Sequence, residues 1–283
     1  MNIEQNKPLK DLTTFKIGGN ADYFISINHY DDIKKAVFFA KKNNLKTFIL
    51  GKGSNIIFDS KGFNGLVIHV NIDFCKLYNN NLIVGAGYSF PLLGHITAKN
   101  DLGGLEFAKG VPGSVGGAIF MNASAFGQNV SDSLISVQCL TENNQIVNLK
   151  KNECNFEYRD SIFQKNKMII LSARFLLQNN NDALKIQKEM LDKKLLNQPL
   201  NERNAGCIFK NPKDTSARKI IESCDLLNCQ VGGAKISLKH ANFIINENEA
   251  SSDDVLNLIK HVKQVVFEKT KINLYEEVKY IPY

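Results

Sequence analysis

The alternation of apolar and polar residues near the N-terminus predicts an amphipathic helix over residues 31–43. Two aspartates open this segment, and lysines separate its apolar positions. Acidic residues in a first turn are favourable because the helix dipole is positive there. We expect this helix to bury Ile33, Val37, Phe38 and Ala40.

Strands account for much of the pattern that follows. Short apolar runs bounded by glycine or by polar turns are typical of strands. Such runs predict strands over residues 47–50, 65–71, 81–85 and 168–178, and a hairpin over 135–150. Because helices and strands are mixed and their connections are short, the pattern indicates an α+β fold.

Helices dominate the last third of the chain. The lysine-rich segment 182–198 predicts a helix that ends before a proline. Residues 215–227 and 251–270 have helical periodicity, with a predicted strand over 241–246 between them. Ser251 begins the last helix as its expected cap. In the lysine-rich helix, the side chains expected to point partly inward are Leu184, Ile186, Met190 and Leu191.

Composition is that of an ordinary globular protein. Of 283 residues, 43% are hydrophobic and 22% are charged, which excludes disordered and collagen-like chains. The length predicts two domains or one large domain, with room for a cofactor. Lys and Arg exceed Asp and Glu by 35 to 28, and the resulting charge of +7 is scattered along the chain. It therefore suits an anionic small molecule at least as well as a nucleic acid.

Targeting signals and cysteines point to the same compartment. The first ten residues are polar, and no apolar run approaches the roughly 18 residues of a spanning helix, so we expect a cytoplasmic protein with no membrane partner. Six cysteines without a C-x-x-C motif predict reduced thiols. Because the spacing of Cys207, Cys224, Cys229 and His240 matches no common zinc motif, we expect no metal.

Two glycine clusters carry candidate binding chemistry. Residues 51–55 follow a predicted strand, but position 56 is isoleucine, so the dinucleotide fingerprint is incomplete. Their glycines could let successive backbone N–H groups face an anion, or the segment could be an ordinary turn. Residues 110–118 contain four glycines and one proline. They could let the backbone approach a flat or charged ligand, or let a helix pack closely.

Six segments, taken in order, resemble the UDP-N-acetylenolpyruvoylglucosamine reductase (MurB) family. They extend over nearly the whole chain, and the ordered set is far more specific than any one segment. The spacing between Arg159 and Cys207 resembles that of the shorter, type II-like subgroup. The segments are TTFKIGG at 13–19, LGKGSN at 50–55, GVPGSVGGA at 110–118 with MNA at 121–123, YRDSIF at 158–163, NAGCIFKNP at 204–212 and EVKY at 277–280.

The resemblance implies an FAD-binding fold of the vanillyl-alcohol-oxidase/PCMH type with two subdomains, followed by a C-terminal α+β substrate-binding domain. The first subdomain would be residues 1–70 with 278–283, the second 71–195, and the substrate domain 196–277. The chain would use FAD and NADPH to reduce UDP-N-acetylglucosamine enolpyruvate to UDP-N-acetylmuramate in peptidoglycan precursor synthesis. We expect a monomer with no nucleic-acid partner.

The resemblance also implies roles for single residues. Arg159 matches the arginine that holds the substrate carboxylate as charge develops on it. Cys207 matches the proton donor, where many members have serine. An ordinary cysteine thiol, with a pKa near 8.5, can donate a proton while it is not ionised. Glu277 matches an assisting glutamate, although Glu276 could occupy that place.

The remaining implied residues bind ligands. His240 could equally be a structural histidine. The expected FAD contacts are Gly51, Lys52, Gly53, Ser54, Asn55, Pro112, Gly113, Ser114, Gly117 and Asn122. The expected substrate contacts are Tyr158, Lys210, Asn211 and His240.

Two other functions share part of this pattern. Another FAD-dependent oxidoreductase of the same superfamily, acting on a hydroxy acid or an alcohol, would explain the glycine clusters but not the set of Arg159, Cys207 and Glu277. A nonenzymatic nucleotide-binding or nucleic-acid-binding protein would explain only the positive charge, and its binding would depend steeply on salt.

Overall fold

The computed structural model describes residues 2–283. The chain forms two compact units, and each is assembled from separate stretches of sequence. The first unit consists chiefly of Ile25–Lys52 and Val67–Lys194. The second consists of Glu4–Phe24, Gly53–Leu66 and Leu195–Tyr283. The three-domain division implied by the family resemblance stays a prediction.

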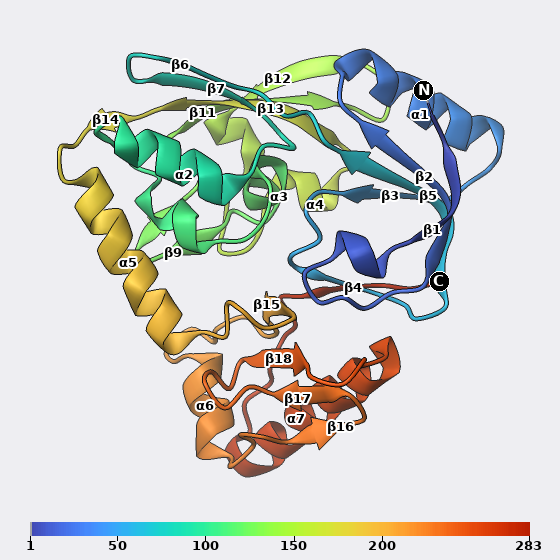
Figure 1. Cartoon of the computed structure of the whole chain (residues 1–283), viewed down its shortest axis with the longest axis vertical. Helices are drawn as coiled ribbons and strands as arrows, with labels where there is room; N and C mark the ends of the chain where they lie inside the picture. Colours follow the sequence, from blue (N-terminus) through green and yellow to red (C-terminus); the bar gives the residue numbers. More distant parts are fainter. Residues whose placement is uncertain (1) are drawn as a thin grey trace. The chain divides into compact units, whose positions relative to one another are not determined.

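The first unit is built around an antiparallel five-stranded sheet in the order β12-β11-β13-β7-β6 (Figure 1). Its strands are β6 Cys75–Tyr78, β7 Asn81–Gly85, β11 Leu134–Leu140, β12 Ile146–Lys150 and β13 Ile169–Leu176. Its helices are α1 Tyr30–Lys42, α2 Phe90–Lys99, η2 Glu106–Gly110, α3 Val115–Phe120, η3 Lys151–Cys154, α4 Ile162–Lys165 and α5 Ala183–Asn197, the last of which ends in the second unit. The shorter strands are β3 Thr47–Leu50, β8 Leu102–Gly103, β9 Ser124–Ala125, β10 Gln128–Asn129 and β14 Gln178–Asn179.

Helices cover this sheet and fix the second glycine cluster. Helix α3 packs on β13 and β7, and α2 packs on η2, where Phe90 and Phe107 meet edge to face with ring centroids 5.6 Å apart. Helix α5 is attached largely by polar bonds. The Gln187 side chain donates to the Gly94 carbonyl at 2.7 Å, and Lys194 Nζ donates to the Gly110 carbonyl at 2.8 Å.

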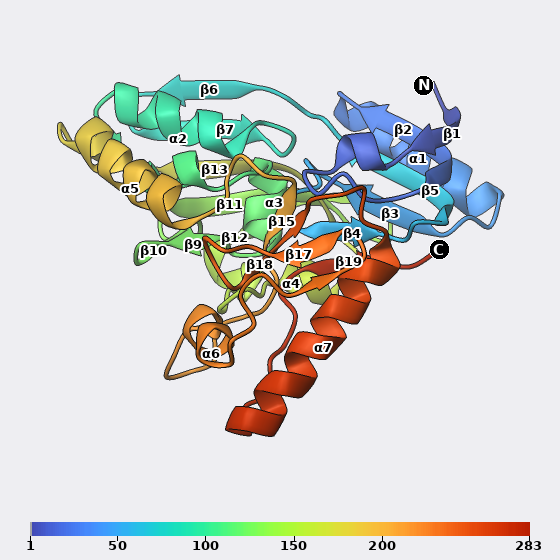
Figure 2. The same cartoon turned by 60° about the horizontal axis from the view of Figure 1, so that its bottom comes forward.

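The second unit contains an antiparallel sheet in the order β15-β18-β17-β16 (Figure 1). Helix α7, the long red helix in Figure 2, packs on β16 and β17. The sheet strands are β15 Asn204–Cys207, β16 Gln230–Val231, β17 Ala234–Ile236 and β18 Phe243–Asn246. Its helices are η1 Lys10–Leu12, α6 Ala217–Ser223 and α7 Ser252–Thr270. The other strands are β1 Glu4–Pro8, β4 Ile56–Phe58 and β19 Lys279–Ile281, and β19 lies parallel to β4.

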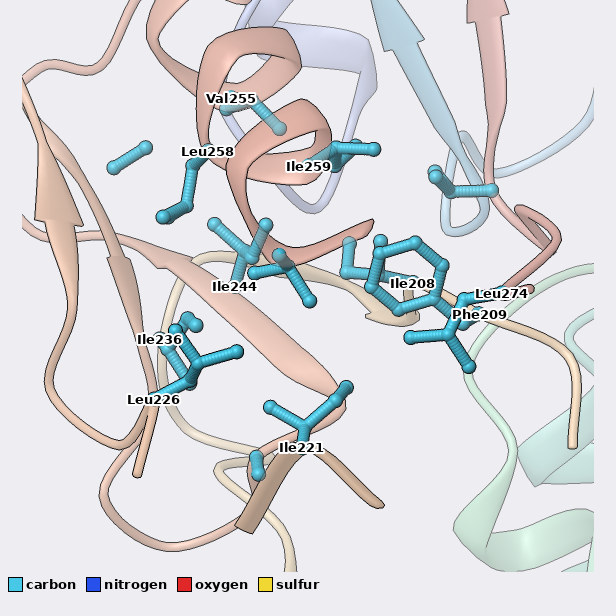
Figure 3. Packing of buried hydrophobic residues seen from close by; sticks show 14 of the residues in the cluster. Ile208, Phe209, Ile221, Leu226, Ile236, Ile244, Val255, Leu258, Ile259 and Leu274 are labelled. Atoms are coloured by element: carbon cyan, nitrogen blue, oxygen red, sulfur yellow. The ribbon is translucent and has the colours of Figure 1, made fainter. Parts of the chain in front are cut away.

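One hydrophobic cluster holds the second unit together. The apolar face of α7 contributes Val255, Leu258 and Ile259, which pack toward Ile236 and Ile244 of the sheet (Figure 3). N-terminal residues of this unit join the same core, which also contains Phe15, Ile17 and Ile57. The core therefore explains why segments distant in sequence form one unit, because burying such side chains removes apolar surface from water.

Strands β2 Asn20–Ile27 and β5 Gly62–Val70 belong to both units, and they lie in a sheet of order β1-β2-β5-β3. No helix in residues 2–283 is long and apolar enough to cross a lipid bilayer. All six cysteines are present as thiols.

Most predicted elements are confirmed within a few residues. The helix predicted at 31–43 is α1, the hairpin at 135–150 is β11 and β12, and the helix at 251–270 is α7 with Ser251 as its cap. Ser251 Oγ accepts a hydrogen bond from the Asp254 amide at 3.1 Å. The helix predicted at 215–227 is shorter, because α6 ends at Ser223 and Asp225 adopts a left-handed backbone.

Burial predictions were wrong in two helices, and Val37 of α1 is only half-buried. Phe38 is 66% exposed, because Ile33, Ala36 and Ala40 form the inward face of α1 and Phe38 lies off that face. In α5, Leu184 is 46% exposed and Gln187 is buried instead, since its amide has a carbonyl partner.

Candidate functional site

Gly51 and Ser114, one from each glycine cluster, lie side by side in the first unit. Gly51 lies directly after β3, and a side-chain carbon placed on it would approach Ser114 Oγ to 2.5 Å. A larger residue at position 51 would therefore have to displace the Ser114 hydroxyl. Two residues that are 63 positions apart in the sequence are thus neighbours in the structure.

The second cluster combines helix packing with an exposed rim. Ser114 caps α3, and its Oγ accepts a hydrogen bond from the Gly117 amide at 3.2 Å. A side-chain carbon at Gly116 would lie 3.0 Å from the Ala86 methyl group, so Gly116 serves close packing. Pro112 and Gly117 are exposed. Gly116 thus supports the close-packing interpretation, and a ligand contact at the exposed residues stays a prediction.

Asn122 contributes a buried polar atom without a partner. This residue follows α3 in a left-handed conformation, with φ of 42°, and is 6% exposed. Its Nδ2 donates to the Glu157 carbonyl at 2.9 Å, while its Oδ1 accepts no hydrogen bond from residues 2–283. An unsatisfied buried acceptor is costly, so it suits a ligand with an N–H or O–H group, as the ring and ribityl chain of a flavin have.

Arg159 stands in a tight turn and is held through its side chain. Its φ of 56° is left-handed, and the flanking residues Glu157 and Asp160 exchange backbone hydrogen bonds of 3.1 and 3.2 Å. The guanidinium donates from Nη1 to Ser124 Oγ at 2.6 Å and from Nη2 to the Ser124 carbonyl at 3.4 Å. It lies over the ring of Tyr158, 5.2 Å from the centroid. The geometry presents an oriented cation beside a half-exposed aromatic ring.

The carboxylate of Asp160, the residue after Arg159, has a lysine partner. The Asp160 carboxylate accepts a hydrogen bond from the Ser161 amide at 2.8 Å and pairs with Lys165 Nζ at 2.7 Å. Lys165 therefore supplies a cation for Asp160, and the guanidinium of Arg159 is directed at Ser124. Sequence reasoning missed Ser124, although it directly follows the Met-Asn-Ala segment at 121–123.

In the second unit, Cys207 ends a strand and Glu277 lies in the segment just before β19. Cys207 ends β15 and is half-buried, and the Gly206 before it has a left-handed φ of 77°. The Glu277 amide donates to the carbonyl of Ile208, the residue after Cys207, at 2.7 Å. This bond brings the candidate proton donor and the candidate assisting acid to one part of the unit.

The two adjacent glutamates differ in their surroundings. Glu276 is exposed, and its carboxylate pairs with Lys263 Nζ at 2.8 Å. Glu277 is half-buried, beside the strand of Cys207. This difference supports Glu277 as the acid of the site and Glu276 as a surface residue.

The other candidate substrate contacts also lie in the second unit. Lys210 is half-buried, and its amide donates to the Tyr275 carbonyl at 2.8 Å. Asn211 is exposed, and its Oδ1 accepts from the Ala217 amide at 3.0 Å, at the start of α6. Part of the Asn211 side chain is thus used to hold α6.

His240 has internal partners. It is 9% exposed, its ring meets Phe243 edge to face at 4.8 Å, and its Nδ1 accepts from the Asn242 amide at 3.2 Å. Burial, together with the nearby Arg218 cation, lowers the pKa of His240 to about 4. The ring is therefore neutral at physiological pH, which supports a structural role.

Comparison with known proteins matches both halves of the chain. Residues 21–150 match the profile of an FAD binding domain. Residues 198–281 match the C-terminal domain of UDP-N-acetylenolpyruvoylglucosamine reductase. The reductase of Protochlamydia amoebophila is 46% identical over 99% of this chain and 94% of its own length. The chain belongs to the UDP-N-acetylenolpyruvoylglucosamine reductase family.

Further relatives agree. The reductase of Chlamydia felis is 42% identical over 97% of this chain and 93% of its own length. The solved structure of MurB from Thermus caldophilus superposes with a TM-score of 0.85 at 31% identity, over 99% of this chain and 98% of that chain. The predicted family, the α+β class with its FAD-binding fold, and the class of FAD-dependent oxidoreductase are confirmed.

Proposed function

We propose that this chain reduces UDP-N-acetylglucosamine enolpyruvate to UDP-N-acetylmuramate, with FAD as cofactor and NADPH as reductant, in the cytoplasmic synthesis of peptidoglycan precursors. The names of the relatives support this reaction, since the chain is 46% and 42% identical to two such reductases over nearly its full length. The division into two FAD-binding subdomains, with residues 196–277 as the substrate domain, is part of the same proposal.

The residues around Gly51, Ser114 and Asn122 fit FAD. The two glycine clusters come together where Gly51 meets Ser114, and the buried Asn122 Oδ1 lacks a donor that a flavin would supply. Lys52 and the half-buried Ser54 add polar groups to the loop at 51–55. When bound, FAD supplies hydride transfer, from NADPH to the methylene carbon of the enolpyruvyl ether.

Arg159 would hold the substrate carboxylate. Hydride addition to the methylene carbon places negative charge on the enolate that the carboxylate forms with the neighbouring carbon. A guanidinium already oriented by Ser124 stabilises that charge as it develops, without reorganising first. The stacking of Arg159 on Tyr158 restricts the cation further.

Cys207 and Glu277 would complete the reduction in the second unit. The thiol of Cys207 donates a proton to the carbon adjacent to the carboxylate. Glu277 assists at the same segment, since its amide is bonded to the residue after Cys207. Lys210 and Asn211, four residues or fewer beyond Cys207, are the substrate-binding groups of this proposal.

The anchored Arg159 is the structural observation that carries the proposal, because an oriented guanidinium suits a substrate carboxylate and an uncharged alcohol has no use for it. A hydroxy acid would use the same cation, so the experiment must identify the substrate. The test is anaerobic stopped-flow absorbance of the FAD-loaded protein. We expect NADPH to bleach the flavin and the enolpyruvyl UDP-sugar to restore its absorbance. UDP-N-acetylglucosamine, which lacks the enolpyruvyl group, is the matched control. A reduced flavin that the enolpyruvyl sugar does not reoxidise would contradict the proposal.

A further inference from the structure

The TTFKIGG segment at residues 13–19 has no role in the chemistry proposed above. Its second threonine, Thr14, bonds to two separate segments of the second unit. The Thr14 amide donates to the Gly53 carbonyl at 3.1 Å, and Thr14 Oγ1 donates to the Asn204 carbonyl at 2.7 Å. Thr14 thus joins the glycine loop at residues 51–55 to Asn204, the first residue of β15.

The Asn204 end of this link leads directly to Cys207. Asn204 is 9% exposed, and its Nδ2 donates to the Pro199 and Glu202 carbonyls, each at 2.8 Å. Its Oδ1 accepts from the Gly206 amide at 2.9 Å, which orients the turn immediately before Cys207. The Thr14 hydroxyl therefore holds Asn204, and the Asn204 side chain in turn holds the backbone just before Cys207.

Asn55 makes the corresponding link to Glu277. Its Nδ2 donates to the Glu277 carbonyl at 3.2 Å, and its own carbonyl accepts from the Lys279 amide at 3.0 Å. Beyond these bonds β4 and β19 run in parallel, with Ile56 opposite Lys279. The side-chain amide of Asn55 is thus directed at the Glu277 segment.

The loop itself cannot easily move relative to these partners. Gly53 has a left-handed φ of 62°, and a side-chain carbon there would approach the Leu12 carbonyl to 2.3 Å. The loop is consequently pressed against the N-terminal segment that carries Thr14. The links also form a closed network, because the Glu277 amide bonds to the Ile208 carbonyl next to Cys207.

We propose that Thr14 and Asn55 are positioning residues that hold the strand of Cys207 and the segment of Glu277 in a fixed place relative to loop residues 53–55. The inference rests on the proposed function, because Thr14 and Asn55 would serve the step in which the substrate receives its proton. It also gives Asn55 a role other than the cofactor contact implied by the family resemblance.

The experiment compares both half-reactions in FAD-loaded variants. Thr14→Val removes the hydroxyl while keeping the branched shape, and Asn55→Ala removes the amide. We expect flavin reoxidation by the enolpyruvyl sugar to slow about tenfold or more, since small misplacements of reacting groups cost that much or more. FAD affinity and the rate of flavin reduction by NADPH should stay within about threefold of the wild-type values, because neither FAD binding nor flavin reduction needs the proton donor. Thr14→Ser should restore reoxidation.

Matched controls remove equivalent bonds elsewhere. Thr141→Val removes a hydroxyl that donates to the Gln145 carbonyl, and Asn100→Ala removes a side-chain amide that donates to the Ile96 carbonyl. Both control variants should carry out flavin reduction and flavin reoxidation at wild-type rates. Equal rates of reoxidation in wild type and Thr14→Val would overturn the positioning role, and so would loss of FAD from Asn55→Ala with reoxidation unchanged in the protein that retains it.

Hydrogen exchange separates this inference from the proposed function. The Ile208 and Glu277 amides should exchange faster in Thr14→Val and Asn55→Ala than in wild type, and the control variants should not differ from wild type. A wild-type flavin that the sugar does not reoxidise would contradict the proposed function alone. Unchanged exchange at both amides would contradict the positioning role, whatever the wild type does with the sugar.

Discussion

The region of Arg159 and the region of Cys207 and Glu277 are fixed in different ways. Arg159 is held through its side chain, by two donated hydrogen bonds to Ser124 and by the ring of Tyr158, on a left-handed backbone. Cys207 and Glu277 are placed through their backbones, Cys207 by the pairing of β15 with β18 and Glu277 by the bond from its amide to the Ile208 carbonyl. A side chain that is positioned only by its backbone, such as Cys207, can be replaced by one of similar chemistry. Arg159 cannot, because its planar guanidinium makes several hydrogen bonds at once.

Removing the proton donor should have the largest effect. We expect Cys207→Ala to slow flavin reoxidation by the enolpyruvyl sugar about 10²–10⁴-fold, the usual range for a positioned general acid. Cys207→Ser should stay active, because the backbone presents either side chain. Stopped-flow absorbance of both half-reactions measures this, and reduction by NADPH should be unchanged in both variants.

The thiol also makes this region sensitive to pH and to oxidants. An ionised thiol cannot donate, so the wild-type rate should fall at alkaline pH, and the fall should be absent in Cys207→Ser. Peroxide or an alkylating reagent should inactivate the wild type but not Cys207→Ser. Cys229→Ser, which changes another half-buried thiol of the same unit, is the control and should remain sensitive. Undiminished reoxidation in Cys207→Ala would exclude the thiol as donor.

Replacing the guanidinium of Arg159 should have the next largest effect on the rate of flavin reoxidation. We expect Arg159→Lys to lower the rate of reoxidation about 10²–10³-fold, since a lysine cannot hold Ser124 and a carboxylate together. Arg174→Lys, at an exposed arginine of β13 in the same unit, should be neutral. A lysine variant with wild-type rates would show that only the charge matters, and the contrast between the two regions would then fail.

The two adjacent glutamates give a smaller and more discriminating test. Glu277→Gln should lower the rate of reoxidation about 10–10²-fold as an assisting acid–base group is lost. Glu276→Gln removes the surface pair with Lys263 and should leave the rate unchanged, with a stability change below about 1 kcal/mol. Steady-state rates and thermal unfolding measure both. The reverse outcome would assign the assisting role to Glu276.

His240 should show the smallest effect on activity and a defined effect on stability. Its folded pKa is lowered to about 4 by burial, so the unfolded state binds a proton between about pH 6.5 and pH 4 that the folded state does not. Stability is therefore full above pH 6.5 and is lost as the pH falls toward 4. His240→Asn keeps an acceptor for the Asn242 amide and removes this titration.

Denaturant unfolding at several pH values checks the prediction. Between pH 7 and pH 4 the wild type should lose on the order of 2 kcal/mol more unfolding free energy than His240→Asn, since each pKa unit corresponds to about 1.4 kcal/mol. The KM for the enolpyruvyl sugar should be unchanged at pH 7. A KM that rises tenfold or so in this variant would assign His240 to substrate binding instead.

Local pattern predicted most of the elements correctly. The helices α1 and α7 and the hairpin of β11 and β12 follow from periodicity and capping, which depend on residues a few positions apart. Errors arose where a helix has more apolar residues than its buried face can hold. Phe38 is exposed for this reason, and Gln187 is buried in place of Leu184 because a distant carbonyl is available to it.

The sequence by itself determined the family, the α+β class and the order of the glycine, arginine, cysteine and glutamate segments, because these reside in local strings of residues. Only the tertiary structure decided what each side chain meets. It separates Glu277 from Glu276, anchors Arg159 on Ser124 and directs the amide of Asn55 at the Glu277 carbonyl, across more than two hundred positions. Such contacts depend on how strands and loops pack around a shared core, and the spacing of residues within a short segment does not predict that packing.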